Sequence, residues 1–220
     1  MTAREFFAVG PGPVQHLIRL AERAGVVVVF SERGVAATDA YSLQAAARPV
    51  IVLNPGKDDY YRHRFDVAHA LGHLIMHDDA EPDGKVAEDQ AHRFAAEFLM
   101  PSEEIAPYLP ASTAGRAWSQ LSDSKEHWGV SLAAHLYRAR ALAVMSDGAH
   151  RNSMVRMSQN GWRRAAPGRV ATLQMPAMLP RAREVLQSSG IDDQAFLSGS
   201  GVSSRLYEVA TLRVPFTDRS

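Results

Sequence analysis

The sequence predicts an α+β fold, in which a small sheet packs on two motif-bearing helices and an all-helical C-terminal region comes after them. Short apolar runs bounded by turn residues indicate strands within the first 55 residues. Residues 62–77 and 86–101 instead place apolar residues at helical spacing, and from about residue 111 the pattern turns helical. We therefore divide the 220 residues into two regions, 1–110 and 111–220.

The first region begins with one predicted helix and three predicted strands. Residues 12–25 predict an amphipathic helix, since apolar residues recur there at helical spacing and Gly25 suits its C-terminal end. The apolar residues of this helix are Val14, Leu17, Ile18 and Ala21. Residues 26–30 predict a buried strand, and residues 39–43 and 48–55 predict two more, the last ending in a turn at Asn54-Pro55.

Further helices are predicted after the second motif helix. Pro101 is expected to end that helix, and Ser102 to cap the next one. Residues 118–146 predict two helices joined at Gly129, with Ser131 capping the second. Beyond a turn-rich joint at residues 160–170, two more helices are predicted at residues 179–190 and 203–212.

Composition limits the chemistry and the location of the protein. The chain has no cysteine, so any metal must be held by His, Asp or Glu. No apolar run approaches the roughly 18 residues that cross a bilayer. The first residues do not resemble a secretory signal, so we expect a cytoplasmic protein with no membrane partner.

The charges are balanced overall but unevenly distributed. Residues 1–150 carry 14 Lys and Arg against 19 Asp and Glu, whereas residues 151–220 carry 10 against 5. The overall balance argues against a nucleic-acid binder along the whole chain. The basic tail is compatible with a surface for nucleic acid or an acidic partner, or with a solvated face near the acidic part.

A polar stripe that contains several histidines runs along the predicted helix 62–77. Its members fall within about 80° of one another at 100° per residue. They are Arg62, Asp66, His69, His73 and His77. The core-facing positions are expected to be Phe65, Val67, Ala68, Leu71, Leu74 and Ile75. Imidazoles four residues apart converge where a zinc ion at about 2.0–2.1 Å accepts both, so we predict His69 and His73 as ligands; the alternative is a pair of structural histidines.

A third ligand is expected from the second motif helix, which carries Glu88 and Glu97. These residues are about 180° apart around a helix, so both cannot face one metal. Glu88 shares its face with the small Ala95, which permits close approach to the histidine helix, so Glu88 is the predicted ligand and Glu97 a surface residue. His92 is a partner that orients a ligand, a fourth ligand or a polar neighbour, and His77 is expected to be structural.

Two stretches together resemble the ImmA/IrrE family of metallo-endopeptidases. "RFDVAHALGHLIMH" and "EDQAHRFAAEFLMP" match that family's Arg-Phe-x-x-Ala-His-Glu-x-x-His and Glu-x-x-Ala-x-x-Phe-Ala-Ala-x-x-x-Met-Pro in order and spacing. "RPVIVLNP", "WGVSLAAHLYRAR" and "GWRRAAPG" resemble the type often fused to a Xre-type helix-turn-helix, here without it, and the resemblance fades after about residue 185. It implies a metallopeptidase domain over residues 1–110, zincin-like motif helices, and zinc held by His69, His73 and Glu88.

One residue departs from the family pattern, because Ala70 occupies the position of the catalytic glutamate. That glutamate takes a proton from the metal-bound water and later delivers one to the leaving amine. A methyl group can do neither, so the site should bind zinc but lose about 10²–10⁴ in rate. Either an active peptidase was inactivated, or the chain is a natural pseudo-peptidase; the intact remainder of both motifs favours deliberate inactivation.

The resemblance implies two candidate functions. The first is a zinc-dependent endopeptidase that cleaves a Xre-type transcriptional repressor in a stress, mobile-element or defence response. The second is a non-catalytic regulator that grips a protein in the same cleft, or DNA through the C-terminal region. Residues 125–142 have helix-turn-helix proportions, with Arg138 and Arg140 on the second helix. Most of that helix is apolar, so we expect it to pack against the peptidase core instead of reading a DNA groove.

Overall fold

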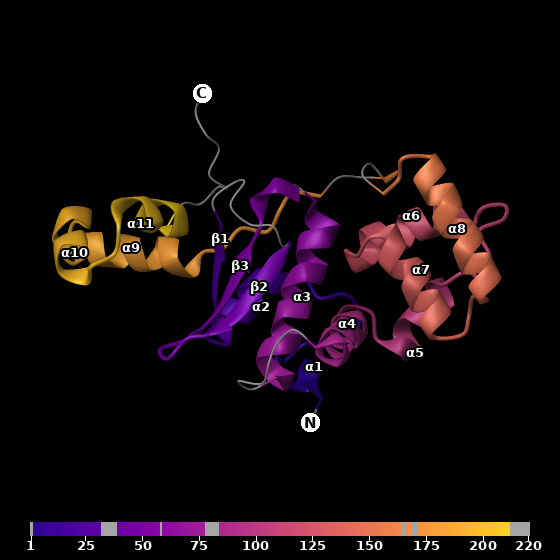
Figure 1. Cartoon of the computed structure of the whole chain (residues 1–220), viewed down its shortest axis with the longest axis horizontal. Helices are drawn as coiled ribbons and strands as arrows, with labels where there is room; N and C mark the ends of the chain where they lie inside the picture. Colours follow the sequence, from indigo (N-terminus) through magenta and orange to yellow (C-terminus); the bar gives the residue numbers. More distant parts are fainter. Residues whose placement is uncertain are drawn as a thin grey trace.

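A three-stranded sheet lies in the middle of the computed structural model, with helix α3 along it and further helices on both sides (Figure 1). The structure describes residues 2–31, 39–57, 59–77, 84–163, 166–168 and 171–211. One small sheet succeeded by helices confirms the predicted α+β class. No helix within these ranges is long and apolar enough to cross a membrane.

All three predicted strands join one sheet in the order β1-β3-β2. Strand β1 (Val27–Phe30) pairs parallel with β3 (Pro49–Leu53), and β2 (Ala40–Gln44) pairs antiparallel with β3. Val28 lies opposite Ile51 in this register, and both side chains are buried. Helix α2 (Leu17–Arg23) packs on β1 and ends before Gly25, whose φ of 94° confirms the predicted stop.

The two motif helices pack closely against each other. They are α3 (Tyr60–Met76) and α4 (Lys85–Leu99), and α3 begins where the Asp59 carboxylate accepts the N–H groups of Tyr61 and Arg62. Their close approach occurs at Gly72, where an added Cβ would lie 3.2 Å from the Cα of Ala91. Ala95, the small residue expected at this contact, is also fully buried. Small side chains therefore set the distance between the helices.

The remaining helices lie on both sides of this centre (Figure 1). Besides the short 3₁₀ turns Pro55–Lys57 and Ala106–Tyr108, they are α1 (Ala3–Phe6), α5 (Ser102–Ile105), α6 (Ala117–Trp128), α7 (Leu132–Ala141), α8 (Asp147–Gln159), α9 (Met178–Ser188), α10 (Asp193–Ser200) and α11 (Ser204–Thr211). Gly129 and Ser131 end α6 and cap α7 as predicted. Helices α1, α8 and α10 were not predicted; α8 is mostly polar and buries His150 and Ser153 beside two methionines, which hides its apolar face.

The predicted capping role of Ser102 is wrong. Pro101 occupies the N-cap position of α5, and Ser102 is the first helical residue. The backbone N–H and the hydroxyl of Ser102 instead donate to Glu97 Oε1, at 3.0 and 3.2 Å. The carboxylate of the preceding helix therefore satisfies the first N–H of this one.

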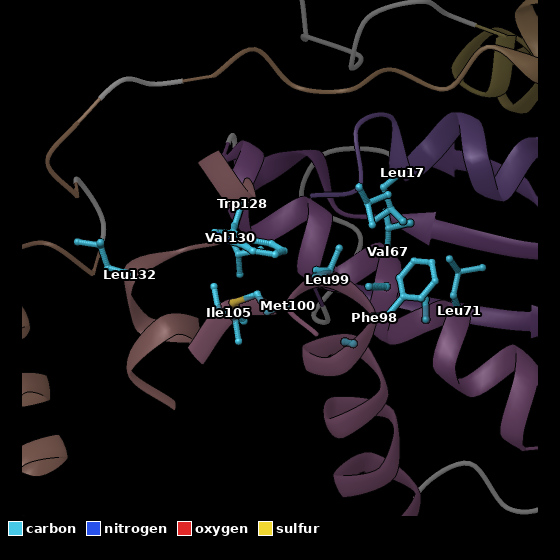
Figure 2. Close-up of a cluster of buried hydrophobic side chains, with 14 of the residues drawn as sticks. Leu17, Val67, Leu71, Phe98, Leu99, Met100, Ile105, Trp128, Val130 and Leu132 are labelled. Atoms are coloured by element: carbon cyan, nitrogen blue, oxygen red, sulfur yellow. The ribbon is translucent and has the colours of Figure 1, made fainter. Parts of the chain in front are cut away.

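One apolar core runs through both predicted regions of the chain (Figure 2). It includes Leu17 and Leu71 beside the sheet, and Ile105, Trp128 and Leu132 from later segments. All five are at most 2% exposed. Buried side chains from both sides of residue 110 belong to this core. The division of the chain into two regions at that residue therefore stays a prediction.

A buried arginine anchors α3. It is the first residue of the histidine motif, and its structural role was not predicted from the sequence. Arg64 is 3% exposed, and its guanidinium donates to the carbonyl oxygens of Gly129 (2.9 Å), Gln15 (3.2 Å) and Val14 (2.5 Å). Gly129 has a φ of 66°, and a Cβ there would lie 2.8 Å from Arg64 Nε. Glycine is therefore required at this turn both by its backbone conformation and by the approach of the guanidinium.

Replacing Arg64 should destabilise the whole fold. Arg64→Met keeps a long apolar stem but leaves three carbonyls without their donor, and we expect it to lower the free energy of unfolding by about 2–5 kcal/mol. Urea unfolding measures this loss. The control is Arg156→Met at an exposed position of α8, which should change stability by about 0.5 kcal/mol or less. Equal stability of the two variants would show that Arg64 is not an anchor.

A second buried polar group joins α6 to α7. His135 is fully buried; Ser131 O lies 3.0 Å from its Nδ1 and the Ser124 hydroxyl 2.9 Å from its Nε2. Burial lowers the pKa of His135 to about 4, against the opposing effect of the Ser131 carbonyl. The neutral ring can donate from Nδ1 and accept at Nε2, so both contacts are satisfied without a charge.

This histidine should make stability fall in mild acid. The unfolded chain takes up a proton at a pKa of about 6.5, whereas the folded chain resists it until about pH 4. The contribution of the neutral His135 ring to the free energy of unfolding is therefore fully present above about pH 6.5 and is lost as the pH falls toward 4. The loss between pH 7 and pH 5 should be about 2 kcal/mol. Urea unfolding of the parent and of His135→Gln should show a shallower pH dependence in the variant. Parallel curves would contradict this prediction.

Candidate metal centre

Helix α3 places two predicted ligands on consecutive turns of one face. His69 and His73 are four residues apart, so their side chains lie above one another. Their ring centroids are 4.8 Å apart, and their Nε2 atoms are 3.1 Å apart. The side chains are 22% and 14% exposed, which leaves them accessible at the edge of the core.

Helix α4 brings the third predicted ligand against both rings. Glu88 lies in its first turn, with Oε2 3.1 Å from His69 Nε2 and Oε1 3.2 Å from His73 Nε2. Within the described part of the chain, these three residues form the one cluster of potential metal ligands, with ligand atoms within 4.8 Å of one another. The structure therefore brings together the three residues that the sequence singled out.

The donor set fits a zinc ion. Zinc bound tetrahedrally at about 2.0–2.1 Å separates its ligand atoms by about 3.3 Å. The two Nε2 atoms lie 3.1 Å apart, close to that spacing, and each contacts a different oxygen of Glu88, at 3.1 and 3.2 Å. One ligand atom from each residue lies within 4.8 Å of the other two. Two imidazoles and one carboxylate also leave a fourth position for water, as in catalytic zinc sites.

Both histidines are kept in the neutral form that a metal requires. Burial lowers the pKa of His69 and of His73, while the neighbouring Glu88 carboxylate opposes the shift in each case. The rings are therefore uncharged at neutral pH, with a lone pair available on a ring nitrogen.

A hydrogen-bond chain leads from His73 away from the cluster. His73 Nδ1 lies 3.1 Å from His77 Nδ1, and His77 Nε2 lies 2.9 Å from Gln90 Oε1. The Gln90 oxygen can only accept, so His77 donates from Nε2 and accepts at Nδ1 from His73. This order leaves the lone pair of His73 on Nε2, toward Glu88. Sequence reasoning missed Gln90, because its contact with His77 depends on the packing of two helices.

Glu97 lies outside the cluster, on the other side of α4. Its side chain is 55% exposed, as expected for a surface residue, but it pairs with the Arg138 guanidinium and accepts from Ser102. Burial alone would raise the pKa of Glu97, but the bonds from Ser102 and Arg138 lower it. Arg138 is itself buried and also donates to Met100 O at 3.1 Å. It therefore ties α7 to α4.

Three other residues of the motifs lie at different depths around the cluster. His92 is exposed and packs its ring 5.3 Å from that of His69 and 5.0 Å from that of Phe65. Ala70 is 2% exposed and belongs to the core. The prediction that Ile75 faces the core is wrong, since it is 48% exposed: the core covers the earlier turns of α3, and its last turn extends beyond them.

The contacts of this centre predict an order of zinc affinities. Glu88→Gln removes a ligand and should abolish stable binding, as should His73→Ala. Gln90→Leu keeps all ligands but removes the acceptor that orders the His77 and His73 tautomers, so we expect an affinity about 10–100-fold lower. Competition with a chromogenic chelator measures these affinities.

Glu97→Gln is the control, because it lies on the same helix but outside the cluster. Its zinc affinity should equal that of the parent. Loss of zinc in Glu97→Gln with retention in Glu88→Gln would reverse the assignment of the two carboxylates. Equal affinity of Gln90→Leu and the parent would show that the hydrogen-bond chain does not orient His73.

The comparison with protein families agrees with this geometry. The family model of the IrrE N-terminal-like domain, a peptidase domain, matches residues 21–140. That range covers more than half of the chain and includes the sheet and both motif helices. Among curated proteins, none matches the chain significantly. The chain thus belongs to the IrrE N-terminal-like family of metallopeptidases, which implies a bound metal.

Proposed function

We propose that this chain is an inactivated zinc-dependent endopeptidase whose substrate is a helix-turn-helix transcriptional repressor of the Xre type. The observation that carries the proposal is the convergence of His69, His73 and Glu88 in a chain of a metallopeptidase family. The repressor as substrate, and the stress, mobile-element or defence response that its cleavage would control, rest on the sequence resemblance alone.

The cluster supplies the metal ligands of a zinc hydrolase but not the general base at its usual position. His69, His73 and Glu88 would hold zinc, which supplies polarisation of the scissile carbonyl and an acidified water. His77 and Gln90 keep His73 in the required tautomer. What is missing is a proton acceptor at the residue after His69, where the Ala70 methyl can neither take nor give a proton.

The surroundings of Ala70 determine how the missing group must be tested. Its methyl is almost fully enclosed in the core, although it comes directly after His69. A glutamate there has to direct its carboxylate past the core toward the cluster, and its longer stem carries a packing cost of about 1–3 kcal/mol. Ala70→Gln has the same size and cost but no basic oxygen, which makes it the matched control.

The competing function is that of a non-catalytic regulator, which would bind a protein or DNA without cleaving it. Recognition of DNA by α7 has little support, since Arg138 is buried against α4 and Arg140 pairs with Asp147 at 2.6 Å. Binding of a protein without cleavage would use the same cleft as the peptidase. The two functions therefore differ only in whether the bound protein is cleaved.

Ala70→Glu should restore cleavage. The test incubates a Xre-like repressor encoded beside the gene with the zinc-loaded parent, Ala70→Glu and Ala70→Gln, and monitors intact repressor by electrophoresis and mass spectrometry. Ala70→Glu should cleave about 10²–10⁴ times faster than the other two, with the rate removed by a chelator and recovered on adding zinc. Zinc content and melting temperature of each variant verify that it is folded and loaded.

The outcome that contradicts the proposal is specific. An Ala70→Glu protein that is folded, holds zinc, binds the repressor and leaves it whole over hours would exclude the inactivated peptidase. The non-catalytic regulator would then take its place. Equal cleavage by Ala70→Glu and Ala70→Gln would show that the carboxylate is not the missing base.

A further inference from the structure

Two adjoining hollows form a groove that reaches the metal-bearing helix. The larger, of about 480 Å³, lies along α7 and α8, and the smaller, of about 140 Å³, extends to the first turn of α3. Tyr137, Met154 and Arg163 line both hollows, so the two adjoin each other. We call the combined hollow the α8 groove.

The α8 groove carries two arginines for which the described part of the chain offers no ion pair. In its larger part, Arg140 and Asp147 neutralise each other through a contact of 2.6 Å. Arg151 and Arg163 line the same part, are exposed, and form no ion pair with any residue that the structure describes. Two unpaired guanidinium groups in one hollow favour an anionic ligand, and their planar shape suits carboxylates.

A buried imidazole nitrogen also lies beside these cations. His150 lines the larger hollow and is 7% exposed, and its Nε2 makes no hydrogen bond within the described ranges of the chain. The Tyr137 ring lies 4.9 Å from the His150 ring. Buried polar groups in proteins are nearly always hydrogen-bonded. Because Nε2 is also out of contact with solvent, a ligand in the groove could hydrogen-bond to it only after neighbouring side chains shift.

The α8 groove leads toward the candidate metal centre. Arg62, on α3, lines the smaller hollow and donates to the main-chain oxygen of Arg163. His69 lies seven residues further along the same face of α3, about 10 Å along the helix axis. An extended peptide covers that distance in about three residues. A peptide in the groove would thus pass the cluster within a few residues.

We propose that the α8 groove binds an acidic segment of the protein substrate, with Arg151 and Arg163 as specificity-determining contacts. In the substrate, this segment would lie a few residues from the peptide bond that is cleaved at the metal centre. Met154 and Val155 line the groove beside the cations, which suits a peptide with acidic and apolar side chains. That the ligand is a segment of a substrate rests on the proposed endopeptidase function. Binding of an acidic peptide in the groove does not require catalysis.

A peptide is favoured over a nucleic acid by the charge around the groove. Residues 1–150 carry five more acidic than basic residues, which opposes a ligand charged along its whole length. A short acidic segment needs only the local cations of the groove. The smaller hollow also reaches α3, whose histidines would carry a peptidase metal, and this favours a polypeptide ligand.

The probe for this site is a fluorescein-labelled hexaglutamate peptide, titrated with the full chain by fluorescence anisotropy in low salt with a chelator present. Arg151→Gln combined with Arg163→Gln should weaken binding about tenfold, because two charge-assisted contacts are lost. The control combines Arg156→Gln on α8 with Arg181→Gln on α9, exposed positions that do not line the groove. It removes the same charge and should leave the affinity unchanged.

Several outcomes would overturn the proposal. If both double variants bind hexaglutamate equally weakly, the peptide is attracted only by the net charge of the protein and not by the groove. Tighter binding of a six-nucleotide single strand, lost in the groove variant, would make the groove a nucleic-acid site. Displacement of hexaglutamate by an equal concentration of inorganic phosphate would make it a site for a small anion.

The same variants separate this inference from the endopeptidase function. If Ala70→Glu cleaves the repressor and the added groove substitutions leave kcat/KM unchanged, the groove proposal is wrong and the peptidase stands. If hexaglutamate binding depends on both arginines while Ala70→Glu cleaves nothing, the groove is supported as a binding site and the proteolytic function alone is contradicted.

Discussion

The guanidinium of Arg64 is buried among three main-chain carbonyls, and the position of α3, which carries two candidate metal ligands, depends on those bonds. Its acceptors come from segments far apart in the chain, Val14 and Gln15 before α2 and Gly129 between α6 and α7. Moving α3 would leave a buried cation and buried carbonyls without partners, at about 1–3 kcal/mol for each. The first half of α3 is therefore held in place, and its second half presents the histidines.

The second motif helix is fixed on two sides. The contact of Gly72 with Ala91 sets its distance from α3 and brings Glu88 against both imidazoles. On its other side, Glu97 binds the buried Arg138 of α7. Glu88 and Glu97 lie about half a turn apart around α4 and therefore face opposite sides. Glu88 faces the candidate metal centre, and Glu97 joins the peptidase core to the later helices.

The resulting cluster gathers three side chains that can hold a cation, and the residue that comes directly after His69 is an alanine. Burial lowers the pKa of His69 and His73, which favours the neutral imidazoles that a divalent metal would need. At the next residue the core closes around the methyl of Ala70. The α8 groove by contrast is lined by Arg151 and Arg163, which form no ion pair with any described residue. Under the functions proposed above, ligand binding in the groove and hydrolysis at the cluster would depend on different residues.

Sequence alone determined the features that depend on local periodicity. His69 and His73 share a face because they are four residues apart on one helix, Glu88 and Glu97 cannot share one, and the three apolar runs near the N-terminus form strands. Only the tertiary structure decided which side chains meet across elements. The bond of His77 to Gln90, the pairing of Glu97 with Arg138 and the exposure of Ile75 depend on how helices dock and where the core ends. Helix α8 escaped prediction for the same reason, since its partly polar buried face is satisfied by neighbours that are distant in sequence, as in the contact of Ser153 with Thr113.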